Sequence, residues 1–514
     1  MADLSLSPAV DTPSAAYTAM IGNWNLIADI LAGADAIRKG GRNGLSADGG
    51  SLYLPKYEEE SRAEYDRRRR SAPWRPEFAD VLRSLASKPF GKNVSLGKNT
   101  SPGIKALSED IDSRGNSLTA FSREAFRYGI ADGLHGILVD FPTMSPNTTI
   151  ADEKAAGARP YWVHIDAKDI IALYTDFIGG VERVTHVRIK ECAVIPNGFG
   201  EVTVNRVRVL LLDAAGKPQW QLWEQQKVQG QEKPTYVQIG GGPISLDFIP
   251  LVLFFTGERQ GEHAVIPPLL DLADMQIELY RALSRQDEIL TFAGSPMLSA
   301  NGFVLPKGDS VAVGPKRILV APPGIEGTGT SWSFVQPNAG NITEVRNHVQ
   351  SVIDDIRRLG MQPLTPKSGT PTATGQSIEA AKAHSAVQTW ALDLQDALEQ
   401  AFVYTAAWLK EPQTVEVTVD VDFSIEPYAP APLQTLQAAR NAKDITLRTY
   451  WDGLRRFDVL PSDFDPDEEE KNLAEELAGL EPDVPIDPAT GQEIVTPPSN
   501  VGANIGGKES SVTP

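Results

Sequence analysis

The chain has 514 residues, 41% of them hydrophobic and 22% charged, a composition typical of a globular protein that folds into roughly two to four units. Its formal net charge of -19 disfavours tight binding of nucleic acid, acidic membrane surfaces or anionic substrates. The single cysteine, Cys192, excludes a disulfide framework within the chain and an all-cysteine metal site.

The amino-terminal part is predicted to be mostly helical. Residues 17–39 place apolar side chains at steps of three and four, which indicates an amphipathic helix. Similar patterns predict helices over 57–71, 76–86 and 117–133. The apolar run 136–142, bounded by glycine and proline, predicts a short buried strand. No signal peptide and no run of about 18 apolar residues is present, so we expect neither secretion by a signal peptide nor a membrane span.

Four consecutive arginines, Arg67 to Arg70, form the strongest basic run of the chain. Such a run can bind phosphate groups. Carboxylates at 58–60, Glu64 and Asp66 precede it at helical spacing, which favours ion pairs on a solvated face or at a subunit contact. We therefore favour the structural interpretation.

The next hundred residues alternate apolar and polar side chains, which predicts an antiparallel sheet. The segments 184–190, 201–213 and 219–225 show the alternation, and 214–218 has the composition of a turn. The sheet region is expected to end near 249–255.

Two long helices are then predicted on either side of a compact piece. The first covers 267–290 and opens with two prolines, which a helix tolerates in its first turn. The compact piece, 293–340, is rich in glycine and proline and contains short strand-like runs. The second helix, 341–359, carries a narrow apolar seam of the kind that packs helices side by side. The seam consists of Ile342, Val345, Val349, Val352, Ile356 and Leu359.

Beyond these helices, a break with three prolines precedes a third long helix that starts after Ser377 and is stopped by Pro412. Its apolar face comprises Val387, Ala391, Leu394, Leu398, Ala401 and Trp408. A strand over 414–423 and helical patterns around 435–454 and 467–478 follow, and the polar remainder from 481 is predicted to be a tail.

No constellation of residues predicts catalysis, a metal or another cofactor. The six histidines are scattered without metal-ligand spacing. The segment 324–331 has the glycine spacing of a phosphate loop, but Thr330 stands where the lysine is required. The acidic run 463–470 resembles a calcium loop with Glu468 at the glycine position, so we interpret it as an acidic helix start. We expect no enzymatic activity, no catalytic residue and no cofactor.

The order of segments nevertheless resembles one known family, the portal proteins of tailed bacteriophages, and specifically a branch long recorded as a family of unknown function. The resemblance covers most of the chain to about Leu480, and its weight lies in the succession rather than in any single motif. The matching segments are WNLIADILAGADAIR, LYLP, SLTAFSREAFRYGIADGLHGILVDFP, IPLVLFF, PPLLDLADMQIELYRALS, LGMQPLTPKSGTPTATGQSIEAAKAHS and RTYWDGLRRFDVLPSDFDPDEEE.

The resemblance implies an α+β multi-domain portal fold. The wing would combine a helical amino-terminal part with an antiparallel sheet, and the clip would be a small α/β piece between two stem helices. The implied parts are the wing at 1–265, stem helix 1 at 266–292, the clip at 293–340, stem helix 2 at 341–360, the tunnel loop at 361–377, the long helix and a wing strand at 378–433, the crown at 434–480 and a flexible tail at 481–514.

It also implies a function: a homo-oligomeric ring, typically a dodecamer, at one capsid vertex that conducts double-stranded DNA during packaging and ejection. Expected partners are the packaging terminase, the major capsid protein and a head-completion or adaptor protein, with no membrane partner. The protein would reside in the virion and assemble in the host cytoplasm. Two other readings remain open: a nucleotide- or nucleic-acid-processing enzyme, and another ring-forming virion protein.

In portal proteins the break after the second stem helix is the tunnel loop, which contacts DNA in the channel. Here Lys367 is its only charged group, and neighbouring threonines offer neutral hydrogen bonds to phosphates. The implied contacts are Thr365, Lys367, Thr370, Thr372 and Thr374. A plain linker between helices is the alternative.

The charge of Lys367 gives the first prediction. Lys367→Glu should leave ring assembly intact and impair DNA packaging or retention, because a ring of carboxylates would repel phosphates. Packaging assays on particles with mutant rings would measure this. Normal packaging would refute a DNA-contacting role for the lysine.

Overall fold

A computed structural model describes the chain over the following residues: 9–47, 49–142, 157–227, 234–294, 297–301, 331–335, 339–360, 373–411, 415–421, 430–456, 459–460 and 464–478. The chain divides into two compact units, Met1–Phe423 and Ser424–Pro514. No helix in these described ranges is both long and apolar enough to cross a membrane.

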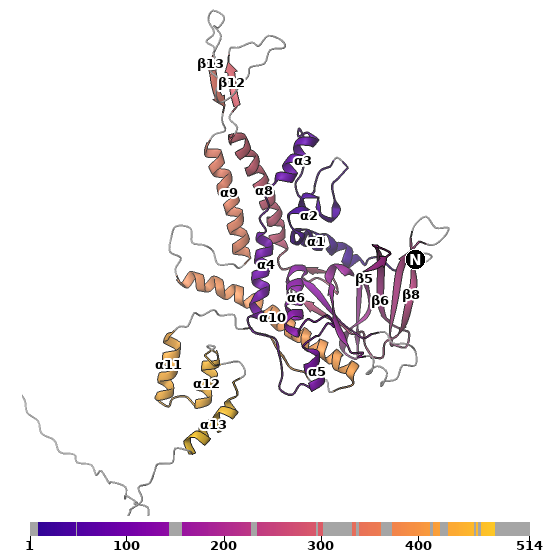
Figure 1. Cartoon of the computed structure of the whole chain (residues 1–514), viewed down its shortest axis with the longest axis vertical. Coiled ribbons are helices and arrows are strands. Elements are labelled where there is room, and N and C mark those ends of the chain that lie inside the picture. The colour runs from indigo at the N-terminus through magenta and orange to yellow at the C-terminus, as the bar shows by residue number, and fades with distance from the viewer. Residues whose placement is uncertain are drawn as a thin grey trace, which may run out of the picture. The chain divides into compact units, whose positions relative to one another are not determined.

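The first unit combines helices with antiparallel sheets (Figure 1). Its helices are α1 (Ala15–Ala32), α2 (Ala34–Arg38), α3 (Arg62–Ser71), α4 (Glu77–Ser87), α5 (Pro102–Leu107), α6 (Leu118–Asp132), α8 (Leu270–Gly294), α9 (Ala339–Leu359) and α10 (Ala373–Leu409), with short 3₁₀ turns at Gly41–Asn43, Lys88–Phe90 and Ala167–Asp169.

Two sheets make up most of the strand structure, and every pairing in them is antiparallel. The smaller sheet has the order β3-β2-β9 and the larger the order β4-β5-β6-β7-β8. Their strands are β2 (Leu134–Asp140), β3 (Tyr161–Asp166), β9 (Leu251–Phe255), β4 (Ile170–Ile178), β5 (Val181–Asn197), β6 (Gly200–Leu212), β7 (Pro218–Gln226) and β8 (Thr235–Pro243).

Three further two-stranded pairings complete the unit. They join β1 (Ser95–Leu96) to β14 (Val417–Thr418), β10 (Glu258–Arg259) to β11 (Val265–Ile266), and β12 (Met297–Asn301) to β13 (Ser331–Val335).

The core is layered because β2 is buried on both faces. Alternate side chains of a strand point to opposite faces. Ile137 and Val139 belong to the main core together with residues of α6 and α10. Leu138 belongs to a second core, which it shares with Val187 and Ile189 of the larger sheet. The smaller sheet therefore lies between two helices and the larger sheet.

Local signals explain how α6 is placed against this sheet. The hydroxyl of Ser117 accepts a hydrogen bond from the first turn, and Gly133 ends the helix in the left-handed conformation. β2 starts directly after Gly133, so the chain reverses and the helix lies against its own strand. The predicted helix over 117–133 and the predicted buried strand over 136–142 are both confirmed.

The helix predicted over 17–39 is wrong in one respect, because Gly33 divides it into α1 and α2. Gly33 has a φ of 87°, a conformation that costs glycine little and other residues more. The helix expected over 57–71 starts at Arg62, where Ser61 and Glu64 form a capping box.

The strand expected over 414–423 is reduced to β14, a pair of residues within the described part of that segment.

The second unit contains α11 (Pro430–Asn441), α12 (Leu447–Arg456) and α13 (Pro466–Ala478). The pattern expected over 435–454 is thus two helices, separated near Lys443, whose φ is 62°. Asp467, Glu468 and Glu469 lie in the first turn of α13, which confirms the acidic helix start.

Gly129 of α6 provides a test of the packing between helix and sheet. A Cβ atom there would lie 2.3 Å from Cε1 of Phe254 in β9. The aromatic ring is packed in the core, so moving it away costs free energy. Gly129→Ala should lower the free energy of unfolding by about 1–3 kcal/mol. Urea denaturation measures the change.

The matched control is Gly22→Ala in α1, where an added Cβ meets nothing within 4 Å. It should leave stability unchanged or raise it by up to about 1 kcal/mol through helix propensity. Equal effects of the two substitutions would contradict the described packing.

Candidate functional site

The most distinctive feature of the first unit is an antiparallel pair of helices that carries a β-hairpin between its two members. α8 and α9 pack side by side, and the β12–β13 strands lie in sequence between them (Figure 1). β12 and β13 pair in register from Met297↔Val335 to Asn301↔Ser331. A closed pair at this point keeps the end of α8 and the start of α9 together.

The apolar seam predicted on α9 is buried only in its middle. Val349, Val352 and Ile356 are buried in the main core, whereas Ile342 and Val345 are half-buried. Leu359 is 49% exposed. Ile353, which lies beside the seam and was not in the predicted set, is 1% exposed. Part of this helix surface therefore remains available for a contact outside the subunit.

α8 is anchored along its length by polar contacts to the amino-terminal segments. Gln276 accepts a hydrogen bond from the backbone N–H of Phe78 at 3.0 Å and donates one to the carbonyl of Arg75 at 2.8 Å. The guanidinium of Arg281 donates to the carbonyls of Tyr53 and Leu52 at 2.9 and 3.0 Å. These bonds fix α4 and the loop before α3 against the helix.

The arginine run contributes to the same anchoring. Arg68 is buried, lies 2.6 Å from Glu60 and 3.6 Å from Glu288 of α8, and stacks on Tyr57. Burial tends to raise the pKa of Glu60, but its hydrogen bonds with Arg68 give a net lowering. The interpretation as ion pairs with local carboxylates is thus correct for Arg68, which is buried rather than on a solvated face. Arg69 pairs similarly with Asp66 at 3.2 Å.

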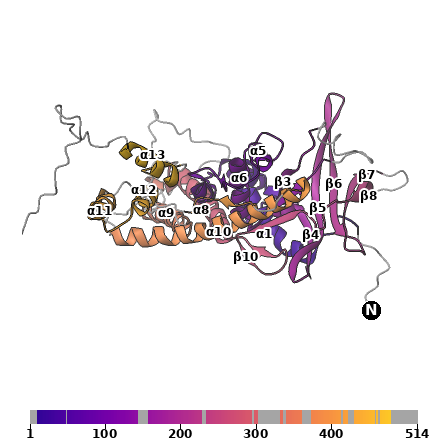
Figure 2. The same ribbon diagram turned by 90° about the horizontal axis from the view of Figure 1, so that it is seen from below.

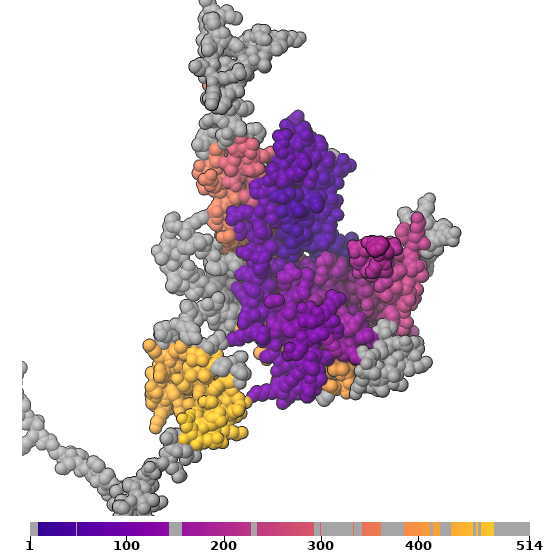
Figure 3. Space-filling view, in the orientation of Figure 1, coloured from indigo at the N-terminus to yellow at the C-terminus, as the bar shows by residue number. Residues whose placement is uncertain are grey.

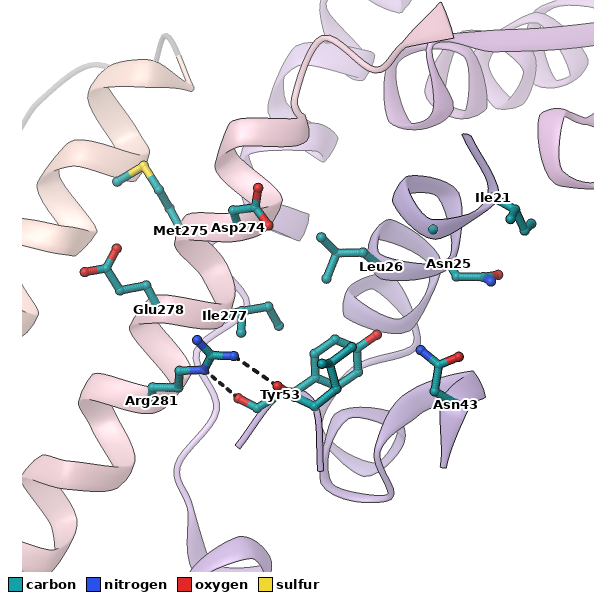
Figure 4. Close-up of a pocket in the computed structure, with 12 residues that line it drawn as sticks. Ile21, Asn25, Leu26, Asn43, Tyr53, Asp274, Met275, Ile277, Glu278 and Arg281 are labelled. Atoms are coloured by element: carbon teal, nitrogen blue, oxygen red, sulfur yellow. Dashed lines mark hydrogen bonds between the residues drawn. The ribbon is translucent and has the colours of Figure 1, made fainter. Parts of the chain in front are cut away.

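A groove of about 730 Å³ runs between α1 and α8. Figure 4 shows Leu26 of α1 and Ile277 of α8 on its apolar floor, with Asp274 and Glu278 along α8. The space-filling view shows the amino-terminal helices, in indigo, beside the exposed surface of α8 and α9 (Figure 3). The groove is lined by both apolar and charged side chains.

A second groove, of about 940 Å³, lies between α10 and the larger sheet. Trp390 and Tyr404 of α10, Phe248, and Ile178 and Val181 at the β4–β5 turn supply its apolar lining. Tyr404 and Phe248 pack with ring centroids 4.4 Å apart. Asp393 and Asp396 add charge on α10, and burial together with Asp396 raises the pKa of Asp393.

The residues predicted to contact DNA lie mostly outside the described residues, which applies to Thr365, Lys367, Thr370 and Thr372. Thr374 lies within α10, which starts at Ala373. The last five residues of the expected tunnel loop, 373–377, are therefore helical. Residues 324–330 of the glycine-rich segment are also outside the described part. Their proposed roles remain predictions.

The structure brings together two histidines that the sequence left scattered. His135 Nε2 lies 2.9 Å from His164 Nδ1, because β2 and β3 pair there. His164 Nε2 is 3.7 Å from Glu124, and Asp166 is 4.0 Å from His135 Nδ1. Neither histidine lines the two grooves. Burial lowers the pKa of both imidazoles, which favours their neutral forms.

Asp132 is a buried carboxyl group in the same region. Burial raises its pKa to about 7, helped by Asp166 and Asp169 and opposed by Lys168. Burial and Asp166 likewise raise the pKa of Asp169 to about 6. Among the described residues, no three histidines, cysteines or carboxylates are grouped as metal ligands would be.

Comparison with known proteins gives one family match. The family described as "Domain of unknown function (DUF4055)" matches residues 268–409, less than half of the chain, from the start of α8 to the end of α10. No curated protein matches.

Among solved structures, the chain is similar to proteins of gene transfer agent (GTA) particles. One is from the neck of an empty particle computed with C6 symmetry, with 12% identity, a TM-score of 0.40, and coverage of 78% of this chain and 90% of that one. Another is from the neck of a native particle computed with C12 symmetry, with 12% identity, a TM-score of 0.40, and coverage of 73% and 88%. A TM-score of 0.40 does not establish a shared fold, so function has to be argued from the chain itself.

Asp132 yields a pH-dependent prediction. Its folded pKa of about 7 exceeds an unfolded value of about 3.9, so the folded protein holds an extra proton and loses stability as pH rises through this window. Asp132→Asn removes that loss. The gain in free energy of unfolding should be on the order of 2 kcal/mol larger at pH 8 than at pH 5, measured by urea denaturation.

Asp169→Asn is the matched control and should give a smaller difference, since the pKa of Asp169 is raised only to about 6. A gain from Asp132→Asn that is the same at both pH values would show that Asp132 is ionised in the folded state throughout.

Proposed function

We propose that this protein is the subunit of a portal ring at a capsid vertex, through which double-stranded DNA passes during packaging and ejection. The observation that carries the proposal is the order α8, β12–β13, α9 and α10, with α8 and α9 packed antiparallel. In the portal family that the sequence resembles, this order is stem, clip, stem and long helix. The break at 361–372 then holds the position of the tunnel loop.

The exposed surfaces support assembly into a ring. α9 leaves Leu359 exposed and Ile342 and Val345 half-buried, so these parts of its apolar seam would be available to a neighbouring copy. The remaining face of α9 is polar, with Glu344, Arg346 and their neighbours exposed. In a ring, the apolar parts pack against the next copy and the polar face is suited to a water-filled channel.

The charge of the chain suits a conduit. A channel that bound phosphates tightly would hold DNA in place, since each neutralised phosphate strengthens the complex. A subunit of charge -19 avoids such retention and leaves any contact with DNA to local groups such as Lys367.

The partners and location follow from this role. The hairpin end of the helix pair would dock the packaging terminase and, later, a head-completion or adaptor protein. The sheet-containing part would contact the major capsid protein. The protein would function in the virion after assembly in the host cytoplasm.

Assembly of the purified protein tests the proposal. Sedimentation analysis should show a discrete species of many subunits whose fraction increases with ionic strength, because salt screens the repulsion between acidic copies. Monomers at every protein and salt concentration would contradict a ring. A ring fraction that is independent of salt would show that charge repulsion does not limit assembly.

A further inference from the structure

One stripe of α8 carries four polar side chains at four-residue steps, which places them on one face of the helix. The outer two have partners, because Gln276 bonds to backbone groups around the start of α4 and Glu288 lies 3.6 Å from Arg68 of α3. The middle two, Tyr280 and Ser284, are 0% and 2% exposed. Neither hydroxyl has a hydrogen-bond partner in the described part of the chain, and a buried polar group left in this way costs free energy.

Three nitrogen donors close to these hydroxyls also lack an acceptor among the described residues. They are Trp74 Nε1, Arg38 Nε and Arg69 Nε. The rings of Trp74 and Tyr280 pack edge to face with centroids 5.6 Å apart. Arg69 donates to the carbonyl of Arg38, and Arg38 donates to the carbonyl of Ala72 at 3.0 Å. These contacts join α2, α3 and the segment before α4 into one group beside α8 (Figure 1).

Positive charge acts on the hydroxyl of Tyr280 from the same group. Burial raises the pKa of Tyr280, whereas the nearby charges of Arg38, Arg69 and Arg68 act to lower it. Arg68 is already paired with its two glutamates, so Arg38 and Arg69 are the cations with a free N–H group.

The carboxylates beside these two arginines leave that N–H group unpaired. Asp35 lies 3.8 Å from Arg38, but its side chain is 86% exposed to solvent. Asp66 is shared between Arg69 and Arg62, at 3.2 Å from each. Neither carboxylate accepts a hydrogen bond from the Nε of Arg38 or Arg69.

The chemistry of the donors favours an anion over water as their acceptor. Guanidinium and indole N–H groups donate only, so each of the three nitrogens needs an acceptor. A water molecule accepts about two hydrogen bonds and has to donate its own hydrogens, whereas an anion accepts several and donates none. Hydrogen bonds between guanidinium groups and an anion are also stronger than those between neutral groups.

We propose that Tyr280, Ser284, Trp74, Arg38 and Arg69 bind a small inorganic anion, with chloride as the representative, between α2, α3 and α8. The anion is small because all five donor atoms are buried. It ties the amino-terminal helices to α8, one member of the α8–α9 pair. Figure 2 shows the larger sheet at the other side of the unit from this pair, so the site is separate from the groove beside α10. The inference does not depend on the proposed ring.

Thermal unfolding of the full chain at fixed ionic strength tests the site. The melting temperature should be higher in sodium chloride than in sodium gluconate by about 2 °C or more, because the gluconate anion is too large to be enclosed. Equal melting temperatures in the two salts would overturn the proposal, since water would then satisfy the donors equally well.

Tyr280→Phe should remove most of the chloride effect. In gluconate this variant should be at least as stable as the unmodified chain, because the substitution removes a buried hydroxyl that has no partner. Tyr65→Phe is the matched control, since the Tyr65 hydroxyl donates to the carbonyl of Leu54 at 2.8 Å and accepts from the N–H of Ser51 at 2.7 Å. It should lower the melting temperature equally in both salts. A full chloride effect in Tyr280→Phe would contradict the assigned site.

Bromide, which replaces chloride in such sites, locates the anion directly. In crystals of the protein grown in sodium bromide, an anomalous difference peak should lie within hydrogen-bonding distance of Tyr280 Oη and Ser284 Oγ. Bromide peaks at the protein surface alone would overturn the inference.

Discussion

The burial of α8 is the constraint on which the rest of the first unit depends. Buried residues occur in every turn from Leu269 to Ser284. The helix contacts α1, α3, α4 and α9. Gln276 and Arg281 add directional contacts to this packing, because each makes two hydrogen bonds to backbone groups of other segments. These contacts hold α8 in place, and α8 in turn leads into the β12–β13 strand pair at its carboxyl end.

The sequence predicted elements whose signals are local. α6 was expected from its apolar pattern and α13 from its helical pattern and acidic start, and both helices are present. The middle of the α9 seam was expected from periodicity, and Val349, Val352 and Ile356 are buried. These signals lie within a single segment, so they can be recognised in the sequence without knowledge of the tertiary structure.

Features that depend on distant segments were not predictable in this way. His135 and His164 meet only because β2 and β3 pair in one register, and no spacing in the sequence encodes that register. The division of the first helix at Gly33 was overlooked because the apolar pattern continues across it. Ile353 is buried in the main core, which widens the buried face of α9 beyond the predicted seam. The grooves, likewise, are made by side chains far apart in the chain.

Two apolar surfaces of the first unit remain uncovered: the end of the α9 seam, where Leu359 is exposed, and the apolar lining of the groove between α10 and the larger sheet. Leaving apolar surface exposed to water does not stabilise a monomer. In the proposed ring, both surfaces would be available for contacts between copies. The acidity of the chain opposes such association, so apolar contact has to outweigh repulsion between copies.

Negative-stain electron microscopy of the purified protein tests most directly whether the subunits form a closed ring. The portal account predicts closed rings with a central hole, formed by one subunit repeated around an axis. Open chains without closure, or isolated monomers at every concentration and ionic strength, would contradict it.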